Sequence, residues 1–154
     1  NNYREAYGLF ACTGILFNHE SILRPSRFVT QKIISTAIRI AGGSNERLVL
    51  GRMDICRDWG WSPEYVEAMW LMLQQSKPED FVIATGVSIT LGEFVEYALS
   101  VLGLNWREYV DQDENLYRPS DIAISHADPS KAREKLQWSA TISGNDVVKK
   151  MLVK

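Results

Sequence analysis

The sequence contains little cysteine and no long apolar run. Its 154 residues include two cysteines, Cys12 and Cys56, whose spacing fits neither a zinc site nor a redox pair. No apolar stretch approaches the roughly 20 residues that a transmembrane helix needs. Residues 1–8 show no basic segment followed by an apolar one, so they do not resemble a secretory signal. We therefore expect a cytoplasmic protein with no metal site and no membrane partner.

An excess of charge of either sign is also missing. The chain has 17 basic and 19 acidic residues, which gives a net charge of -2. Because a nucleic-acid-binding surface needs a basic excess, a nucleic acid is not expected as a partner. Hydrophobic residues make up 45% of the chain, which is long enough for one domain with a substantial core.

Several catalytic and cofactor-binding motifs are absent from the sequence. It has no G-x-G-x-x-G loop, no Walker loop and no G-x-S-x-G elbow. None of its six tyrosines is followed by a lysine four residues later, so it has no Tyr-x-x-x-Lys pair. We therefore assign no catalytic residue to this chain.

Short strands alternate with helices along the chain, and this alternation indicates the α/β class. Residues 9–17 are continuously apolar or small, so we expect a strand buried on both faces of a parallel sheet. Gly8 closes what reads as a helix end, and a chain that opens this way is expected to belong to something longer. Further helices are predicted at 28–41, from 62 through 73 with its end at Lys77-Pro78, and at 90–102, 128–136 and 143–152, with strands at 48–50 and 81–84.

Local signals mark the starts of several of these helices. Ser62 is predicted to cap a helix that has Pro63 at its first position, and Ser143 is predicted to cap the last helix. Thr90 and Glu93 have the spacing of a capping box. The helix after Ser62 carries an apolar stripe that we expect in the core: Tyr65, Val66, Met69, Trp70, Met72 and Leu73.

Polar side chains directly follow the strand predicted at 9–17. Open α/β sheets bind their ligands at the carboxyl ends of strands. The amide of Asn18 can donate to a phosphate or a sugar hydroxyl, or it can cap the loop. His19 is either a ligand contact or a structural histidine, and Glu20 either accepts a hydrogen bond or is solvated.

Two arginines are candidates for binding a diphosphate. Arg57 has the planar fork that makes paired hydrogen bonds to phosphates, and Asp58 beside it either holds it in place or caps a turn. Arg118 precedes a proline, which restricts its backbone to an extended form. We hypothesise that both arginines converge on the same phosphates. Lys32 either strengthens an anion-binding helix N-terminus or is an ordinary surface lysine.

Five segments taken together resemble one enzyme family. They are Asn18-His19-Glu20-Ser21, Phe28-Val29-Thr30 with Lys32-Ile33, Arg57-Asp58-Trp59-Gly60, Tyr65 to Gln74, and Asp128-Pro129-Ser130-Lys131-Ala132. On these segments the chain resembles the C-terminal portion of the GDP-mannose 4,6-dehydratases, which are extended short-chain dehydrogenases/reductases. The likeness runs from about Asn2 to Trp138.

The resemblance implies a two-part fold and an internal redox reaction. Residues 1–154 would be the C-terminal GDP-sugar-binding portion, with strands near 9–17 and 81–84 that complete a Rossmann sheet. Most of that NADP-binding Rossmann domain would be missing. The family converts GDP-mannose to GDP-4-keto-6-deoxymannose and water, with hydride leaving for NADP and returning. The catalytic groups would precede Asn1, so the isolated chain is expected to be inactive. A homo-oligomer, either a dimer or a tetramer, is also expected.

The resemblance assigns binding roles to particular residues. His19 and Arg24 match positions that contact NADP. The GDP-sugar pocket is expected to include Asn18, Thr30, Lys32, Gly51, Arg57, Arg118 and Asp121.

The chain departs from the family pattern at three places. Ile22-Leu23-Arg24-Pro25 replaces the usual Pro-Arg-Arg-Gly, Arg52 replaces an asparagine, and Gly60-Trp61-Ser62-Pro63 replaces Gly-His-Ala-Lys. Two other interpretations stay open. One is part of another GDP-sugar epimerase or reductase, and the other is a non-catalytic nucleotide-sugar-binding module.

Overall fold

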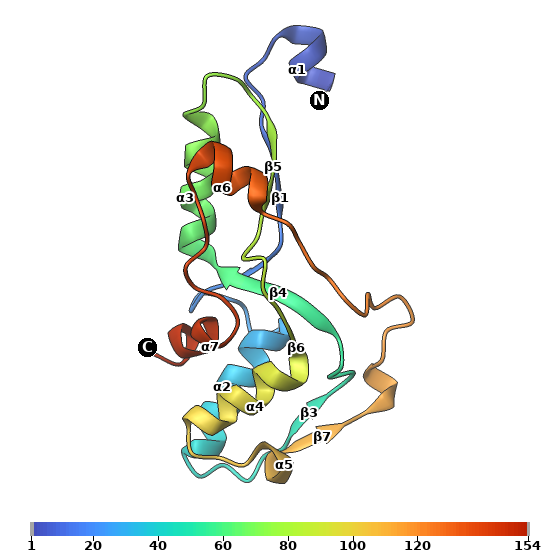
Figure 1. Cartoon of the computed structure of the whole chain (residues 1–154). Coiled ribbons are helices and arrows are strands. Elements are labelled where there is room, and N and C mark those ends of the chain that lie inside the picture. The colour runs from blue at the N-terminus through green and yellow to red at the C-terminus, as the bar shows by residue number, and fades with distance from the viewer. Residues whose placement is uncertain (1, 154) are drawn as a thin grey trace.

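The computed structural model describes residues 2–153 and confirms the predicted α/β class. The chain is elongated, as Figure 1 shows. The helices are α1 (Asn2–Tyr7), α2 (Val29–Ala41), α3 (Ser62–Leu73), α4 (Leu91–Val101), α5 (Trp106–Tyr109), α6 (Ser130–Leu136) and α7 (Asn145–Leu152), with a 3-10 helix, η1 (Glu114–Leu116). The strands are β1 (Thr13–Leu16), β2 (Asn18–Glu20), β3 (Leu48–Leu50), β4 (Cys56–Trp61), β5 (Asp80–Ile83), β6 (Ser88–Thr90) and β7 (Val110–Gln112).

The described strands form three small sheets. β1 pairs with β5 in parallel, and β3 pairs with β7 in parallel. Between them, β4 pairs in parallel with β2 and antiparallel with β6. In Figure 1, α3, α6, β1 and β5 form one end, α2, α4, α5, β3 and β7 form the other, and β4 crosses between them. This topology places Asn18 just beyond the carboxyl end of β1, as predicted.

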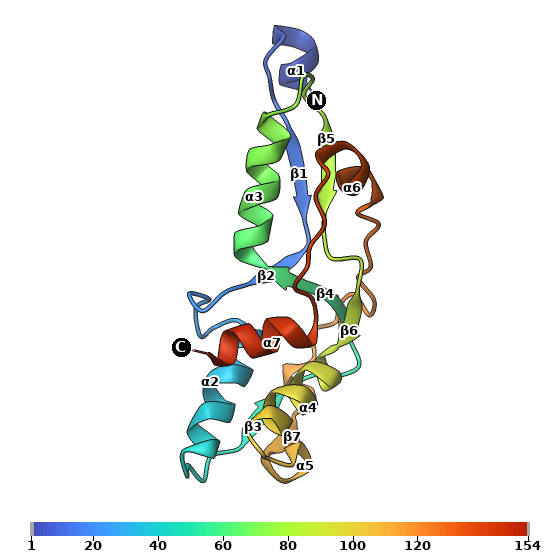
Figure 2. The ribbon, with the colours of Figure 1, turned by 60° about the vertical axis from the view of Figure 1, so that its left-hand side comes forward.

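Each end of the molecule has its own hydrophobic core. The larger core joins α2, α4 and α7 to β3 and β4, and Phe94 and Leu99 of α4 are fully buried in it. Figure 2 shows α7 lying across α2 and α4. The smaller core joins α3, β5 and α6 around Tyr65 and Phe81. Because β4 contributes Trp59 to the larger core and leads directly into α3, it ties the two ends together.

The strongest local signals are confirmed. Thr90 and Glu93 form a capping box at the start of α4. Gly8 and Gly103 follow the ends of α1 and α4 with φ values of +64° and +74°. Glycine reaches this left-handed backbone without the strain that a Cβ would cause, so it ends both helices.

Two predicted caps are wrong. Ser62 is the first residue of α3, whose N-cap is Trp61, and no side chain caps that helix. Gly144, rather than Ser143, is the N-cap of α7. In both cases the backbone enters the helix one residue away from the predicted position, so the hydroxyl does not cap the helix. Strands β2, β4, β6 and β7 were not predicted, because each is short or mixes polar with apolar residues.

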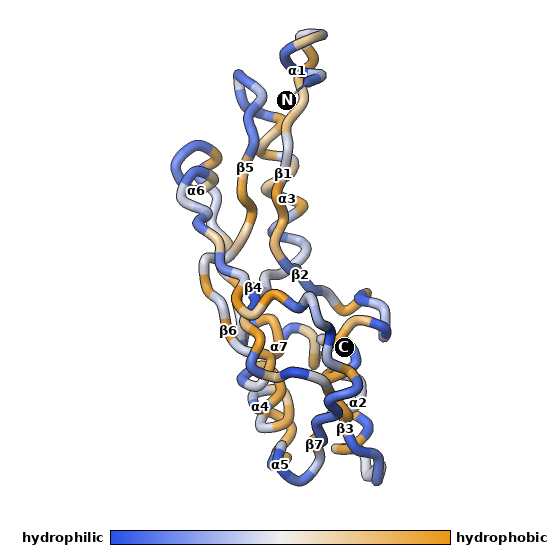
Figure 3. The backbone as a smooth tube through the Cα atoms, turned by 90° about the vertical axis from the view of Figure 1, so that its right-hand side faces the viewer, coloured by the Kyte–Doolittle hydropathy of each residue, from blue (hydrophilic) through white to orange (hydrophobic). Residues whose placement is uncertain are grey.

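The apolar residues at 9–17 and on α3 are less buried than predicted. β1 spans only Thr13–Leu16, and Ile15 is 53% exposed because the smaller core covers only the other face of the β1–β5 pair. Figure 3 shows the apolar colouring along this uncovered stretch. On α3, Tyr65 and Met72 are buried, but one helix cannot turn two apolar faces toward the same core. The exposed members of its stripe are Val66, Met69, Trp70 and Leu73.

None of the helices described between residues 2 and 153 has the length and apolar character that crossing a bilayer requires.

Candidate functional site

One cavity of about 700 Å³ collects most of the predicted binding residues. It lies between the N-terminal end of α2, the loop after β3, the start of β4 and the segment at 115–121. Every predicted binding residue except His19 lines it. These residues are Asn18, Arg24, Thr30, Lys32, Gly51, Arg57, Arg118 and Asp121.

The lining of this cavity is strongly basic. Six of its residues carry a guanidinium or ammonium group, against two carboxylates, those of Glu20 and Asp121. The basic residues are Arg24, Arg27, Lys32, Arg52, Arg57 and Arg118. A concave surface with an excess of one charge concentrates ligands of the opposite charge. The cavity therefore suits an anion, and its guanidinium groups suit a phosphate.

Arg57 enters the cavity from β4 with its guanidinium fixed in place. Its Nη1 donates to the backbone oxygens of Cys56 at 2.7 Å and of Ile122 at 2.6 Å. A carboxylate oxygen of Asp121 lies 3.9 Å from Nη2. The side chain is 16% exposed, so these contacts largely set its direction. They leave the edge formed by Nε and Nη2 without a hydrogen bond to any of residues 2–153.

Arg118 reaches the same cavity from the segment that follows η1. Its side chain is exposed, and no ion pair among residues 2–153 engages it. Arg57 and Arg118 therefore line one shared cavity although they come from distant parts of the sequence. The first of them is held by the protein, and the second is available to a ligand.

Glu20 forms a buried acidic contact in the cavity wall. Its carboxylate lies 3.0 Å from Nε of Arg24, whose guanidinium stacks over the Phe28 ring at 3.8 Å from the ring centroid. Burial raises the pKa of Glu20, and the charge of Arg24 partly offsets that effect. The ion pair and the ring together fix the position of Arg24.

Because the pKa of Glu20 is raised, the stability of the unmodified chain should depend on pH in a way that the stability of Glu20→Gln does not. A carboxyl whose pKa is higher in the folded state stabilises the fold most at a pH below its ordinary pKa of 4.5. That stabilisation is lost as the pH rises through the raised pKa. We expect the free energy of unfolding of the unmodified chain, relative to that of Glu20→Gln, to fall as the pH rises above the ordinary pKa of 4.5. Urea unfolding followed by circular dichroism measures this difference, and a difference that grows with pH would contradict the burial effect.

The N-terminal end of α2 also opens into the cavity. Its N-cap, Phe28, provides no side-chain hydrogen bond to the first turn, and Val29 and Thr30 line the cavity. The unpaired N–H groups and partial positive charge of such a helix end attract anions. The Nζ of Lys32 donates to the backbone oxygen of Val49 at 2.6 Å, which fixes that ammonium group at the cavity wall.

Gly51 is required by a close backbone approach at this cavity. A Cβ at this position would lie 3.0 Å from the backbone oxygen of Leu116. Any larger residue would push the segment that carries Arg118 away from the loop after β3. The absence of a side chain at Gly51 therefore shapes the cavity.

Asp58 does not hold Arg57, although it is the next residue. It is fully buried on the other face of β4, where its carboxylate accepts hydrogen bonds from Thr85 and Gly86. Of the two roles left open for Asp58, the structure supports the turn-capping one. Asp58 secures the segment between β5 and β6 to β4.

His19 lies outside the cavity. Side chains alternate along a strand, so His19 points away from the face of β2 that carries Asn18 and Glu20. Its Nδ1 lies 2.8 Å from the backbone oxygen of Phe17, and its ring stacks on Tyr65 with the centroids 4.7 Å apart. Because a carbonyl only accepts, Nδ1 donates and Nε2 is the ring nitrogen left for another partner.

His19 and Arg24 are the residues here that the resemblance links to NADP. Arg24 lies in the loop after β2 and lines the cavity, whereas His19 lies on the face of β2 opposite Asn18 and Glu20 and does not line it. Each still offers polar hydrogen-bonding atoms of the kind that a phosphorylated dinucleotide binds. The chain therefore fits only part of an NADP site.

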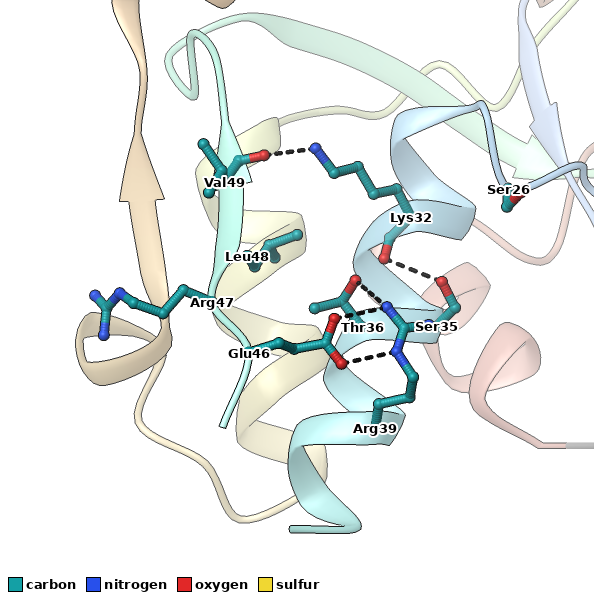
Figure 4. A pocket seen from close by; sticks show the side chains of 9 residues that line it. All are labelled: Ser26, Lys32, Ser35, Thr36, Arg39, Glu46, Arg47, Leu48 and Val49. Atoms are coloured by element: carbon teal, nitrogen blue, oxygen red, sulfur yellow. Dashed lines mark hydrogen bonds and ion pairs between the residues drawn. The ribbon is translucent and has the colours of Figure 1, made fainter. Parts of the chain in front are cut away.

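A second hollow, of about 480 Å³, lies between α2 and β3 (Figure 4). In this hollow the Arg39 guanidinium donates hydrogen bonds to both carboxylate oxygens of Glu46 and to the hydroxyl oxygen of Thr36. Arg47 points away from the others and pairs with Asp111. Of the predicted binding residues only Lys32 lines this hollow, so it is not the predicted anion site.

Comparison with known proteins agrees with this geometry. A family model described as GDP-mannose 4,6 dehydratase matches residues 1–151. The chain belongs to the GDP-mannose 4,6-dehydratase family. It is 50% identical over 151 residues to GDP-mannose 4,6 dehydratase 2 of Arabidopsis thaliana, covering 98% of this chain and 40% of that protein. It is 42% identical over 168 residues to the Homo sapiens GDP-mannose 4,6 dehydratase, covering 98% and 45%.

The chain thus spans less than half the length of these dehydratase relatives. Solved structures show the same fold over a similar share. RMD from Pseudomonas aeruginosa, complexed with NADPH, has a TM-score of 0.85 at 16% identity and covers 98% of this chain and 49% of that one. A dTDP-glucose 4,6-dehydratase from Bacillus anthracis, in complex with NAD, has a TM-score of 0.84 at 15% identity, with 97% and 46% covered. The predicted fold, the C-terminal part of an extended short-chain dehydrogenase/reductase, is confirmed.

Among the polar side chains that line the cavity, those of Arg27, Arg52, Asn115 and Tyr117 were given no binding role from the sequence. Arg52 directly follows Gly51 and already stood out as a departure from the family pattern. Tyr117 directly precedes Arg118. Nearness in sequence to predicted residues was the signal that could have identified both.

Proposed function

We propose that this chain is the GDP-sugar-binding part of a GDP-mannose 4,6-dehydratase. That enzyme is a lyase that converts GDP-mannose to GDP-4-keto-6-deoxymannose and water. The observation that carries the proposal is the basic cavity that Arg57 and Arg118 line together. A nucleoside diphosphate concentrates its charge on two adjacent phosphates, and paired guanidinium forks match those oxygens in geometry.

The other cavity residues take roles that follow from their positions. The N-terminal end of α2, with Thr30 and Lys32, adds positive potential beside the phosphates. Asn18 offers an amide to the sugar, and Asp121 accepts from the guanine or ribose end. Gly51 keeps the two walls close enough to contact the same ligand.

NADP is the cofactor in this proposal. When bound, it accepts a hydride from the sugar and later returns it. The residues of this chain only bind: His19 offers Nε2, and Arg24 offers its guanidinium. Because no catalytic residue is assigned to residues 1–154, we expect no turnover from this chain alone.

The remaining assignments are proposals of the same kind. We place the protein in the cytoplasm as a homo-oligomer. We also propose that β1 and β5 belong to a larger Rossmann sheet, because one face of this strand pair is uncovered. A different GDP-sugar epimerase or reductase, and a non-catalytic module, would use the same cavity, but the family match favours the dehydratase.

Titration of the chain with GDP, followed by amide chemical shifts, tests this function. NMR is chosen because we expect weak binding to this part of the enzyme. GDP should shift the amides of Thr30 and Gly51 saturably. Arg57→Ala should weaken GDP binding by about 1.5–3 kcal/mol, or about 10- to 150-fold, as expected for hydrogen bonds to a charged group.

Arg133→Ala is the matched control, because it removes the same charge from exposed α6, away from the cavity. It should leave GDP affinity unchanged. If GDP moves no cavity amide, or if the two arginine variants behave alike, the diphosphate assignment is wrong.

A further inference from the structure

Arg52 is one of the five arginines that line the cavity. It follows Gly51 in the loop after β3, and its side chain is partly exposed. It occupies the position at which the sequence departs from the asparagine usual in this family. Neither the sequence motifs nor the proposed roles above include it.

Asp54 fixes the plane of this guanidinium. Nε of Arg52 donates to one carboxylate oxygen of Asp54 at 2.9 Å, and Nη2 donates to the other at 2.5 Å. Asp54 is 67% exposed and does not line the cavity, so it binds Arg52 from outside the cavity. The pairing occupies one edge of the fork and leaves Nη1 without a hydrogen bond to any of residues 2–153.

The free edge of Arg52 belongs to a cavity wall that also carries Arg57 and Arg118. Tyr117, Arg118 and Asp121 line the same cavity as Arg52, so a ligand in this cavity can contact both Arg52 and the segment that carries Arg118. A two-point carboxylate pair holds a guanidinium in one plane, and a pre-positioned donor loses less entropy on binding.

We propose that Arg52 binds the phosphate oxygens of a nucleoside diphosphate in this cavity, with Asp54 as its positioning residue. The inference rests on the proposed function, because it uses the same ligand. It adds a phosphate contact that is particular to this chain.

GDP titrations of variants, followed by the same amide shifts, test the proposal. Arg52→Asn should raise the Kd for GDP about tenfold and flatten the dependence of Kd on salt. Arg52→Lys should recover part of the affinity, because it restores the charge without the fork. Arg47→Asn is the matched control. Arg47 also forms a bidentate ion pair with an aspartate, but it does not line the cavity. It should leave the Kd unchanged.

Asp54→Asn separates positioning from simple charge. Removing a negative charge beside a basic cavity would tighten GDP binding if net charge alone mattered. If Asp54 positions Arg52, the Kd should instead rise about threefold. An unchanged or lower Kd overturns the role of Asp54.

The two proposals fail in different ways. If Arg57→Ala weakens GDP binding and Arg52→Asn does not, the Arg52 contact is wrong and the proposed function stands. If the unmodified chain shows no saturable shift with GDP, both are wrong.

Discussion

Replacing Asp58 with alanine should lower the free energy of unfolding by about 3–4 kcal/mol. The Asp58 carboxylate is fully buried and accepts from the backbone N–H of Thr85 at 3.1 Å and of Gly86 at 2.7 Å, and from the Thr85 hydroxyl at 2.8 Å. The hydroxyl can turn to the backbone oxygen of Val87, whereas the two N–H groups make no other hydrogen bond to residues 2–153. Each buried donor left unpaired costs about 1–3 kcal/mol.

Urea unfolding followed by circular dichroism measures the loss. Asp58→Asn, which keeps one accepting oxygen, should be intermediate. Asp111→Ala removes an exposed carboxylate paired with Arg47 and should change stability little. If Asp58→Ala were as stable as Asp111→Ala, Asp58 would not hold the segment between β5 and β6.

Gly60→Ala should destabilise the protein by about 3 kcal/mol, which corresponds to a melting temperature about 6–12 °C lower. A Cβ on Gly60 would lie 2.6 Å from the hydroxyl oxygen of Tyr65 and 2.8 Å from its Cζ. Tyr65 cannot retreat, because it is fully buried between the stacked ring of His19 and the edge-on ring of Trp138. The added methyl must therefore displace β4 or α3.

Gly92→Ala provides a control of the opposite sign. Gly92 lies in the first turn of α4, where a Cβ would come no closer than 3.4 Å to the backbone oxygen of Met53. Alanine there should stabilise the chain slightly, because it restricts the unfolded state. Differential scanning calorimetry of both variants gives the comparison. If the two glycines tolerated alanine equally well, the packing of Tyr65 against β4 would be wrong.

Features that depend only on residues nearby in the sequence could be predicted from it. The capping box of Thr90 and Glu93 and the glycine at position 103 lie within a few residues of the ends they define. Burial depends on what packs against an element from elsewhere. Ile15 and Trp70 look like core residues by pattern, yet they are 53% and 58% exposed because no described element covers them.

The candidate site was predicted only in part, because it too depends on residues that are far apart in the sequence. The cavity unites Arg57 and Arg118, a convergence that chemistry suggested but spacing in the sequence could not prove. The partners of Asp58 lie 27 and 28 residues away, on a segment whose path no local pattern predicts. His19 illustrates the opposite case, since recognising β2 as a strand would have placed it on the face opposite Asn18.

The most direct test of the central claim is a crystal structure of this chain with GDP. The claim predicts diphosphate oxygens within about 3 Å of guanidinium nitrogens of both Arg57 and Arg118. GDP bound outside the cavity, or a diphosphate that contacts only one of these arginines, would contradict it.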